Sequence, residues 1–489
     1  MATDFTLVRA APVVGIERAS QEREAPVIRV LIVTARPGGA RDVGYRTISR
    51  PLLDALRNIE TPVEVDLLRP GTFKALSNRL EERKDKPYHV VHFDLHGALM
   101  NFDEAHAALN EDAAADRLTM RYGRDQLSVF DGKDGFLVFE PENRPVNDGD
   151  PVRDLAKSDE VAALLARYKV PIAILNACQS GKQDGSDLET SLGARLMEAG
   201  AQNVLAMGYS VTVSAAEKMM PVLYQALFSG ATLGEAVRRA RLELQNDQAR
   251  LARFNREIDL EDWILPVLYQ REEALLKPRR MYPDEETVWL ERQAKYATDP
   301  RTATGAFLGR DLDVLQIERR LDEHNFLLIY GGGGTGKTTL LHHLGAWWQR
   351  TGWIEKMEYF GYDRQAWSLE QILAQLSQSV LDDSERRNLV AAPAALQQKI
   401  VQRLRSHRHL LVLDNLESVT AEAFAIRNEL PPEKREEIRV FLAKLVGGQS
   451  LVLLGARGPV DWLEAGVTRA GSGATRQQPD YLLHGLDAD

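Results

Sequence analysis

The sequence contains a single cysteine, Cys178, among 489 residues. One cysteine excludes an intramolecular disulfide and any zinc cluster built from several thiolates. Cys178 is therefore either a residue of the hydrophobic core or a reactive nucleophile, and the residues around it decide between the two.

Long apolar runs are also lacking. The apolar runs at residues 30–33, 171–175 and 410–413 have the length of β-strands and are too short to span a membrane. The first 25 residues contain no signal-peptide core. We therefore expect a cytoplasmic protein with no membrane span and with a flexible tail over residues 1–25.

Positive charge is not in excess, because 61 Lys and Arg residues are balanced by 71 Asp and Glu residues, for a net charge of −10. A nucleic-acid platform built on bulk positive charge is thus not expected. The hydrophobic fraction of 44% is ordinary for a globular protein and is sufficient to form buried cores.

The length predicts two or three domains. From Ile28 onward, short apolar runs alternate with longer amphipathic stretches, which is typical of an α/β fold with a mostly parallel sheet. We predict strands at residues 28–34, 63–67, 89–93, 135–140, 171–176 and 203–207. Thr232 and Glu235 have capping-box spacing, which predicts that a helix begins there.

Charge and proline content indicate the boundaries. Residues 103–116 and 143–150 are charged or rich in Gly, Asn and Asp, and we expect them to be surface insertions. Residues 276–305 have the composition of a linker, with Pro278, Pro283 and Pro300 and one predicted helix near residues 286–296. This predicts a first domain over residues 26–275 and a second over residues 306–489, whose βα series begins near Phe326.

A glycine-rich loop follows the apolar run at residues 327–330. It matches the G-x-x-x-x-G-K-[ST] pattern and precedes a helical stretch, which is the context that this motif requires. Backbone N–H groups of such a loop bind phosphate oxygens at a helix N-terminus. Lys337 would add charge at the β and γ phosphates, and Thr338 would bind Mg²⁺. The predicted nucleotide-binding loop consists of Gly331, Gly332, Gly333, Gly334, Thr335, Gly336, Lys337, Thr338 and Thr339.

Three charged residues follow two later apolar runs of the second domain. Asp414 ends the run at residues 410–413 and is the expected second Mg²⁺ contact. Glu417 either polarises an attacking water molecule or is a solvated loop acid. Arg457, after the predicted strand at residues 450–454, is either a sensor of the γ-phosphate or an ordinary surface arginine. The expected cofactors are ATP or ADP with Mg²⁺.

Residues 307–311, the strand that ends in Asp414 and the segment that ends in Arg457 resemble the STAND class of signal-transducing P-loop NTPases, which are related to NB-ARC and NACHT ATPases. Members hold ADP at rest, exchange it for ATP on sensing a ligand, and then oligomerise. The resemblance implies an activating ligand or partner and a nucleotide-dependent oligomer. Residues 481–486 resemble the strand that leads to the lid and winged-helix segments of the class, which we expect to be missing from residues 306–489.

Cys178 and His96 each follow an apolar run that is predicted to be a strand. The cysteine lies in Asn176-Ala177-Cys178-Gln179-Ser180-Gly181, and the histidine is followed by Gly97. Active sites of open parallel sheets form at the carboxyl ends of strands, so neighbouring strands would bring both side chains to one edge. An imidazole activates a thiol near neutral pH, and the N–H groups of Gly97 and Cys178 would bind the oxyanion.

These segments resemble the CHAT family of caspase-like, clan CD cysteine peptidases. The resemblance covers about residues 28–269 and includes Arg36-Pro37, His96-Gly97, and residues 176–181, 203–211 and 262–269. It implies that Cys178 attacks the scissile carbonyl of a protein substrate and that His96 protonates the leaving amine. Relatives often carry an acid two residues before the cysteine to bind a basic P1 side chain, whereas this chain has Asn176. Asp94 would restore a basic preference and Arg36 would favour an acidic P1 residue; both alternatives stay open.

The sequence thus predicts a caspase-like α/β/α sandwich followed by a P-loop NTPase domain with a mostly parallel sheet. The expected function is a cysteine endopeptidase gated by ATP or ADP, with slow ATPase activity. Fusions of this type resemble bacterial effectors of defence or regulated death. The alternative is a non-proteolytic STAND switch whose first domain mediates interactions. In a third interpretation, the peptidase is constitutive and the nucleotide site is structural.

Overall fold

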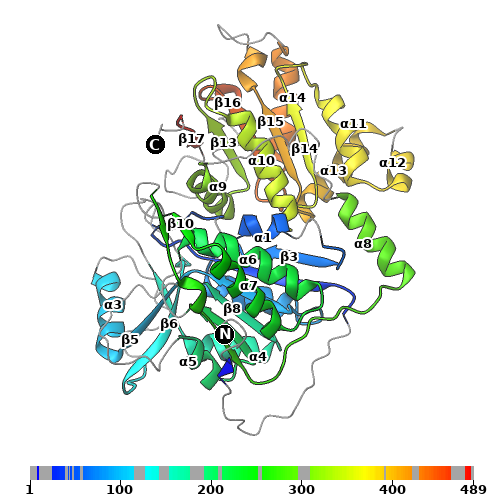
Figure 1. Cartoon of the computed structure of the whole chain (residues 1–489). Helices are drawn as coiled ribbons and strands as arrows, with labels where there is room; N and C mark the ends of the chain where they lie inside the picture. Colours follow the sequence, from blue (N-terminus) through cyan, green and yellow to red (C-terminus); the bar gives the residue numbers. More distant parts are fainter. Residues whose placement is uncertain are drawn as a thin grey trace. The chain divides into compact units, whose positions relative to one another are not determined.

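The computed structural model describes residues 8–9, 25–38, 42, 44–46, 49–55, 59–114, 127–142, 153–176, 192–207, 212–251, 256–295, 309–389, 392–420, 429–463 and 480–485. The chain divides into two compact units, Met1–Tyr282 and Pro283–Asp489 (Figure 1).

The first unit is built on a seven-stranded sheet. Strands β3, β2, β4, β8 and β9 are mutually parallel, and β12 joins β9 in the antiparallel sense and carries β1 on its outer side. In sheet order, the strands are β1 (Val8–Arg9), β12 (Pro266–Gln270), β9 (Asn203–Met207), β8 (Ile172–Asn176), β4 (Val90–Asp94), β2 (Ile28–Thr34) and β3 (Val63–Leu67).

Helices cover both faces of this sheet, which is why its central strands are continuous apolar runs. All residues of β2 and β4 are buried. Leu31, Phe93 and Leu175 share one core cluster with α2 (Phe73–Glu82), α4 (Ser158–Arg167) and α5 (Leu192–Glu198). His92, which alternates with Phe93 on β4, instead contacts Tyr224 of α6 on the other face, at 2.7 Å between Nδ1 and the hydroxyl.

Helix α6 (Val213–Phe228) packs against α1 (Ser49–Ala55) and α7 (Leu233–Asn246) on this second face (Figure 1). Helix α7 begins as predicted, because the Thr232 hydroxyl accepts a hydrogen bond from the Glu235 N–H. The arrangement is an α/β/α sandwich, which confirms the predicted fold class.

A second, three-stranded antiparallel sheet extends from the carboxyl end of β4. It contains β5 (His96–Asn101), β6 (Lys133–Phe139) and β7 (Asp154–Lys157). The predicted strand at residues 135–140 therefore lies outside the main sheet, and β5 was not predicted. Residues 103–116, expected to be an insertion, contribute most of helix α3 (Phe102–Ala114), while residues 143–150 lie outside the described residues.

The second unit contains a five-stranded parallel sheet. Its order is β14 (Met357–Gly361), β15 (Leu410–Asp414), β16 (Leu451–Ala456), β13 (Phe326–Tyr330) and β17 (Asp480–Leu482). The associated helices are α8 (Pro283–Lys295), α9 (Asp311–Glu323), α10 (Lys337–Arg350), α11 (Leu369–Val380), α12 (Asp383–Leu389), α13 (Pro393–Ser406), η7 (Leu416–Thr420), α14 (Pro432–Ala443) and α15 (Asp461–Leu463).

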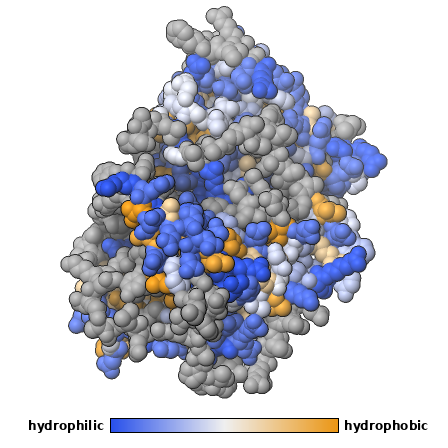
Figure 2. All heavy atoms as spheres, viewed as in Figure 1, coloured by the Kyte–Doolittle hydropathy of each residue, from blue (hydrophilic) through white to orange (hydrophobic). Residues whose placement is uncertain are grey.

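The described surface is mostly polar on the face drawn in Figure 2, where hydrophobic residues form small separate groups. Among the helices that the structure describes, none is long and apolar enough to cross a membrane.

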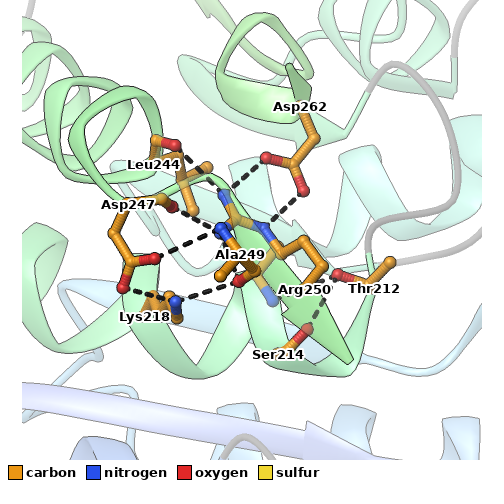
Figure 3. A network of polar contacts seen from close by, with 9 residues as sticks. Thr212, Ser214, Lys218, Leu244, Asp247, Ala249, Arg250 and Asp262 are labelled. Carbon is orange, nitrogen blue, oxygen red and sulfur yellow. Dashed lines mark hydrogen bonds and ion pairs between the residues drawn. The ribbon is translucent and has the colours of Figure 1, made fainter. Parts of the chain in front are cut away.

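A buried arginine joins the elements that lead into β12. The Arg250 guanidinium donates hydrogen bonds to both carboxylate oxygens of Asp262, at 2.6 and 2.8 Å, and to the carbonyl oxygen of Leu244 at 3.1 Å (Figure 3). Arg250 lies on β10 (Ala249–Leu251), which pairs with β11 (Glu257–Asp259), and Asp262 begins η5 (Asp262–Ile264). The bidentate pair attaches η5 to β10, and the bond to Leu244 connects both to the end of α7.

Replacing Arg250→Met leaves the Asp262 carboxylate buried without its cation. We expect the free energy of unfolding of the first unit to fall by about 3 kcal/mol. Arg238→Met is the matched control, since Arg238 forms a partly exposed ion pair with Glu235, and we expect it to cost less than about 0.5 kcal/mol. Urea-dependent hydrogen exchange of the α7 and β12 peptides measures both changes, and equal losses in the two variants would contradict the buried-pair interpretation.

Candidate functional site

Three predicted site residues, Arg36, Asp94 and Asn176, meet at the carboxyl edge of the main sheet. In the parallel register, Thr34 of β2 lies opposite Asp94 of β4, and Asp94 lies opposite Asn176 of β8. The Asn176 amide donates to the Asp94 carboxylate at 3.5 Å. Cys178 follows two residues after Asn176 and lies outside the described residues.

Arg36 and Asp94 form a buried ion pair at this edge. The Arg36 guanidinium lies 2.6 Å from Asp94 Oδ2 and donates to the Asp94 carbonyl oxygen at 2.7 Å. Burial raises the pKa of Asp94, although the Arg36 charge and the Asn176 amide oppose this rise. The two candidate P1-pocket charges therefore neutralise each other, and neither presents a lone charge.

His96 begins β5, directly after the carboxyl end of β4. Its Nε2 atom lies 2.8 Å from Oδ1 of Asp42, and its side chain is 31% exposed. Gly97, the predicted oxyanion residue, is buried and lies opposite Leu137 of β6.

Asp42 was not among the predicted site residues. Burial alone would raise the pKa of its carboxyl group, but the hydrogen bond and charge of His96 and the Gly38 N–H together lower it. The available sequence signal was an acid in the loop after the first strand, because that loop begins at the same sheet edge as His96.

The phosphate-binding loop connects β13 to α10 as predicted. Gly334 and Gly336 have φ values of 80° and 87°, a conformation that favours glycine. A Cβ atom added at Gly333, Gly334 or Gly336 would meet no atom within 4 Å, so one side of the loop is open. The Lys337 ammonium group folds onto the loop and donates to the carbonyl oxygens of Gly331 and Gly332 at 2.7 and 2.8 Å.

Asp414 ends β15 and is held by neutral donors. Its Oδ2 atom accepts hydrogen bonds from the Thr338 hydroxyl at 2.6 Å and from the Tyr359 hydroxyl at 2.9 Å, and its Oδ1 accepts the Asn415 N–H. Burial and the nearby Asp414 charge raise the pKa of Tyr359 well above its ordinary value, so the phenol remains a donor. Tyr359 was not predicted, because it lies on β14 with no local motif.

Glu417 and Arg457 form an ion pair near this loop. The Arg457 side chain lies 3.1 Å from one Glu417 carboxylate oxygen, and its backbone N–H donates to the other at 3.2 Å. Glu417 is buried, so it is not a solvated loop acid, and Arg457 is not an isolated surface charge. Burial lowers the pKa of Lys337, whereas the charges of Glu417 and Asp414 act to raise it.

One residue of the predicted motif before the loop contacts the loop directly. Arg310 donates to the Thr335 carbonyl oxygen at 2.9 Å and pairs with Asp313 of α9 at 3.2 Å. Phe307 and Leu308 of the same motif lie outside the described residues.

The loop and its neighbours fit a nucleotide with Mg²⁺. Open backbone N–H groups at a helix N-terminus suit phosphate, and Thr338 with Asp414 suits an ion that takes few protein ligands and completes its shell with phosphate and water. Within the described ranges, no group of three or more His, Cys, Asp or Glu side chains is arranged to hold a metal ion.

Comparison with protein families gives a family match in each unit. Residues 10–282 match the CHAT domain family, and residues 319–452 match an AAA domain family. The CHAT match spans more than half of the chain, and the chain therefore belongs to the CHAT-domain family. Its second unit contains an AAA-type P-loop NTPase domain. The narrower STAND assignment stays a prediction.

Solved structures similar to the chain include replication initiators. The Aeropyrum pernix ORC1 protein in complex with DNA aligns at 16% identity and a TM-score of 0.25, over 39% of this chain and 49% of that one. A DNA replication initiation factor aligns at 18% and 0.22, over 35% and 49%. Domain III of Thermotoga maritima DnaA aligns at 14% and 0.22, over 39% and 70%. This chain thus spans about half the length of the first two, and scores this low carry no argument. No curated protein matches the sequence.

Gly455 of β16 provides a test of the Asp414 position. A Cβ atom there would lie 2.1 Å from Asp414 Oδ1, whereas one at Gly458 would meet nothing within 4 Å. We expect Gly455→Ala to displace the carboxylate and to weaken Mg²⁺-dependent binding of a fluorescent ATP analogue about tenfold. Gly458→Ala should bind as the unaltered protein does. Equal Mg²⁺-dependent affinity for the ATP analogue in both variants would show that Asp414 does not bind the metal.

Proposed function

We propose that the protein is a cysteine endopeptidase whose nucleophile is Cys178 and whose proton-transfer group is His96, regulated by nucleotide binding to the second unit. The register of β4 and β8 carries this proposal. Asp94 and Asn176 are neighbours across the two strands, and His96 and Cys178 each follow two residues after one of them. The chain therefore leaves the adjacent strands β4 and β8 at the same level of the sheet, and it reaches His96 or Cys178 two residues later.

The proposed reaction uses these two side chains and one water molecule. The Cys178 thiol gives its proton to His96 while its sulfur bonds to the scissile carbonyl carbon, whose π electrons move to oxygen. The carbon–nitrogen bond then breaks, and the leaving amine takes the proton from His96. Water hydrolyses the thioester to a carboxylate and restores the thiol. The N–H groups of Gly97 and Cys178 are the proposed oxyanion donors.

For regulation, we propose that the P-loop domain acts as a STAND-type switch. ATP with Mg²⁺ supplies phosphate charge at the loop, where Lys337, Thr338 and Asp414 would bind it. The Lys337 ammonium group now contacts loop carbonyls, and phosphate oxygens compete for the same donor. When a nucleotide binds, Lys337 would release the loop carbonyls, and the hydrogen bond between Thr338 and Asp414 would change. We propose that these local changes transmit the presence of the nucleotide to the rest of the unit.

Labelling of the sole thiol by a peptidyl acyloxymethyl ketone tests the proposal. We expect rapid labelling with ATP and Mg²⁺, none in Cys178→Ala, and a loss of about 100-fold or more in His96→Ala. Lys337→Ala should keep the thiol but lose the nucleotide dependence.

Two results would count against parts of this proposal. Slow labelling of the unaltered protein in every nucleotide state would favour the non-proteolytic interaction module. A Lys337→Ala variant that loses thermal stability but keeps unchanged labelling would indicate a purely structural nucleotide site.

A further inference from the structure

Within the part of the chain that the structure describes, Asp42 is the side chain that hydrogen-bonds to the His96 ring, and its carboxylate is itself held in place. Oδ1 lies 2.8 Å from His96 Nε2, and Oδ2 accepts the Gly38 N–H at 2.7 Å. The Asp42 side chain is 9% exposed, against 31% for His96. The contact thus joins a largely buried, backbone-anchored acid to a partly open imidazole.

The charge of Asp42 determines which nitrogen of His96 carries a proton. The lowered pKa of Asp42 keeps the carboxyl group ionised near neutral pH, and an ionised carboxylate only accepts hydrogen bonds. His96 Nε2 must then be the donor. In the neutral imidazole, the lone pair that takes up a proton is therefore on Nδ1.

We propose that Asp42 is a positioning residue for the reaction, which orients the His96 ring and holds its Nε2–H tautomer so that Nδ1 exchanges the proton with Cys178. This inference rests on the proposed function of His96. Asp42 also stabilises the imidazolium that forms when His96 takes the thiol proton, because opposite charges at hydrogen-bond distance favour the charged form.

Gly38 makes the position of Asp42 testable from a second residue. A Cβ atom at Gly38 would lie 2.7 Å from Asp42 Oδ1 and 3.1 Å from its Cγ. A side chain there would push the carboxylate from the ring without changing any titratable group. Gly38→Ala is thus expected to reproduce the effect of altering Asp42.

The tautomer is measured directly in the full chain labelled with ¹⁵N-histidine. Imidazole ¹⁵N shifts distinguish the two neutral tautomers, and His96→Ala identifies the His96 signals among those of the 10 histidines. We expect the Nε2–H form in the unaltered protein and loss of this preference in Asp42→Asn and Gly38→Ala. An unchanged tautomer in Asp42→Asn would overturn the proposal, whether or not the thiol reacts.

Thiol reactivity gives the functional readout, with the peptidyl acyloxymethyl ketone as probe. We expect Asp42→Asn to slow labelling by about tenfold or more, Asp42→Glu to recover part of the rate, and exposed Asp85→Asn to leave it unchanged. In a His96→Ala background, Asp42→Asn should not slow labelling further, because the imidazole that Asp42 positions is already absent. Additive losses would overturn the proposal.

The two readouts separate the failures. An unreactive thiol in the unaltered protein contradicts the proposed peptidase function, and the ¹⁵N shifts still decide whether Asp42 sets the tautomer of His96.

Discussion

The carboxyl edge of the first sheet depends on the buried pair of Arg36 and Asp94. The guanidinium donates to the carbonyl oxygen of Asp94 and of its own neighbour Ala35, so it joins the ends of β2 and β4. The Arg36 backbone N–H donates to Glu140, which follows β6 of the second sheet. Because an ion removed from water is tolerated only with a compensating partner, each member requires the other. The start of β5, and with it His96, is thereby held at a defined place.

Each unit ends a central parallel strand with an aspartate, and the surroundings give the two carboxylates different uses. Asp94 pairs with the Arg36 guanidinium, so its negative charge is compensated within the protein. Asp414 accepts hydrogen bonds from two hydroxyls and one backbone N–H, and no described cationic side chain forms an ion pair with it. Hydroxyl donors orient a carboxylate without cancelling its charge, which leaves Asp414 able to bind a cation. The same position at the end of a strand therefore serves structure in one unit and suits metal binding in the other.

The sequence predicted the elements that depend on local pattern. Strands 28–34, 63–67 and 203–207 were predicted to the residue, since buried parallel strands are continuous apolar runs bounded by polar turns. The P-loop was recognised from its own residues. Residues 135–140 were predicted as a strand of a mostly parallel sheet, but they pair with β5 and β7 in the antiparallel sheet, because an apolar run does not indicate which sheet it joins. Asp42 and Tyr359 were missed for a related reason: their contacts with His96 and Asp414 span 54 and 55 residues, and no periodicity reports such distant pairings.

Two of the described carboxylates act on the His96 ring, and their surroundings differ. The Asp94 charge acts on His96 at longer range, but Arg36 already neutralises it and burial makes its ionised form costly. Asp42 instead contacts the ring directly, and its second carboxylate oxygen accepts the Gly38 N–H. An imidazole between two uncompensated carboxylates would hold its proton too firmly to return it to a leaving amine. Pairing Asp94 with Arg36 therefore does more than close the sheet edge, because it leaves Asp42 as the described carboxylate in hydrogen-bond contact with His96, the arrangement on which the proposed proton transfer depends.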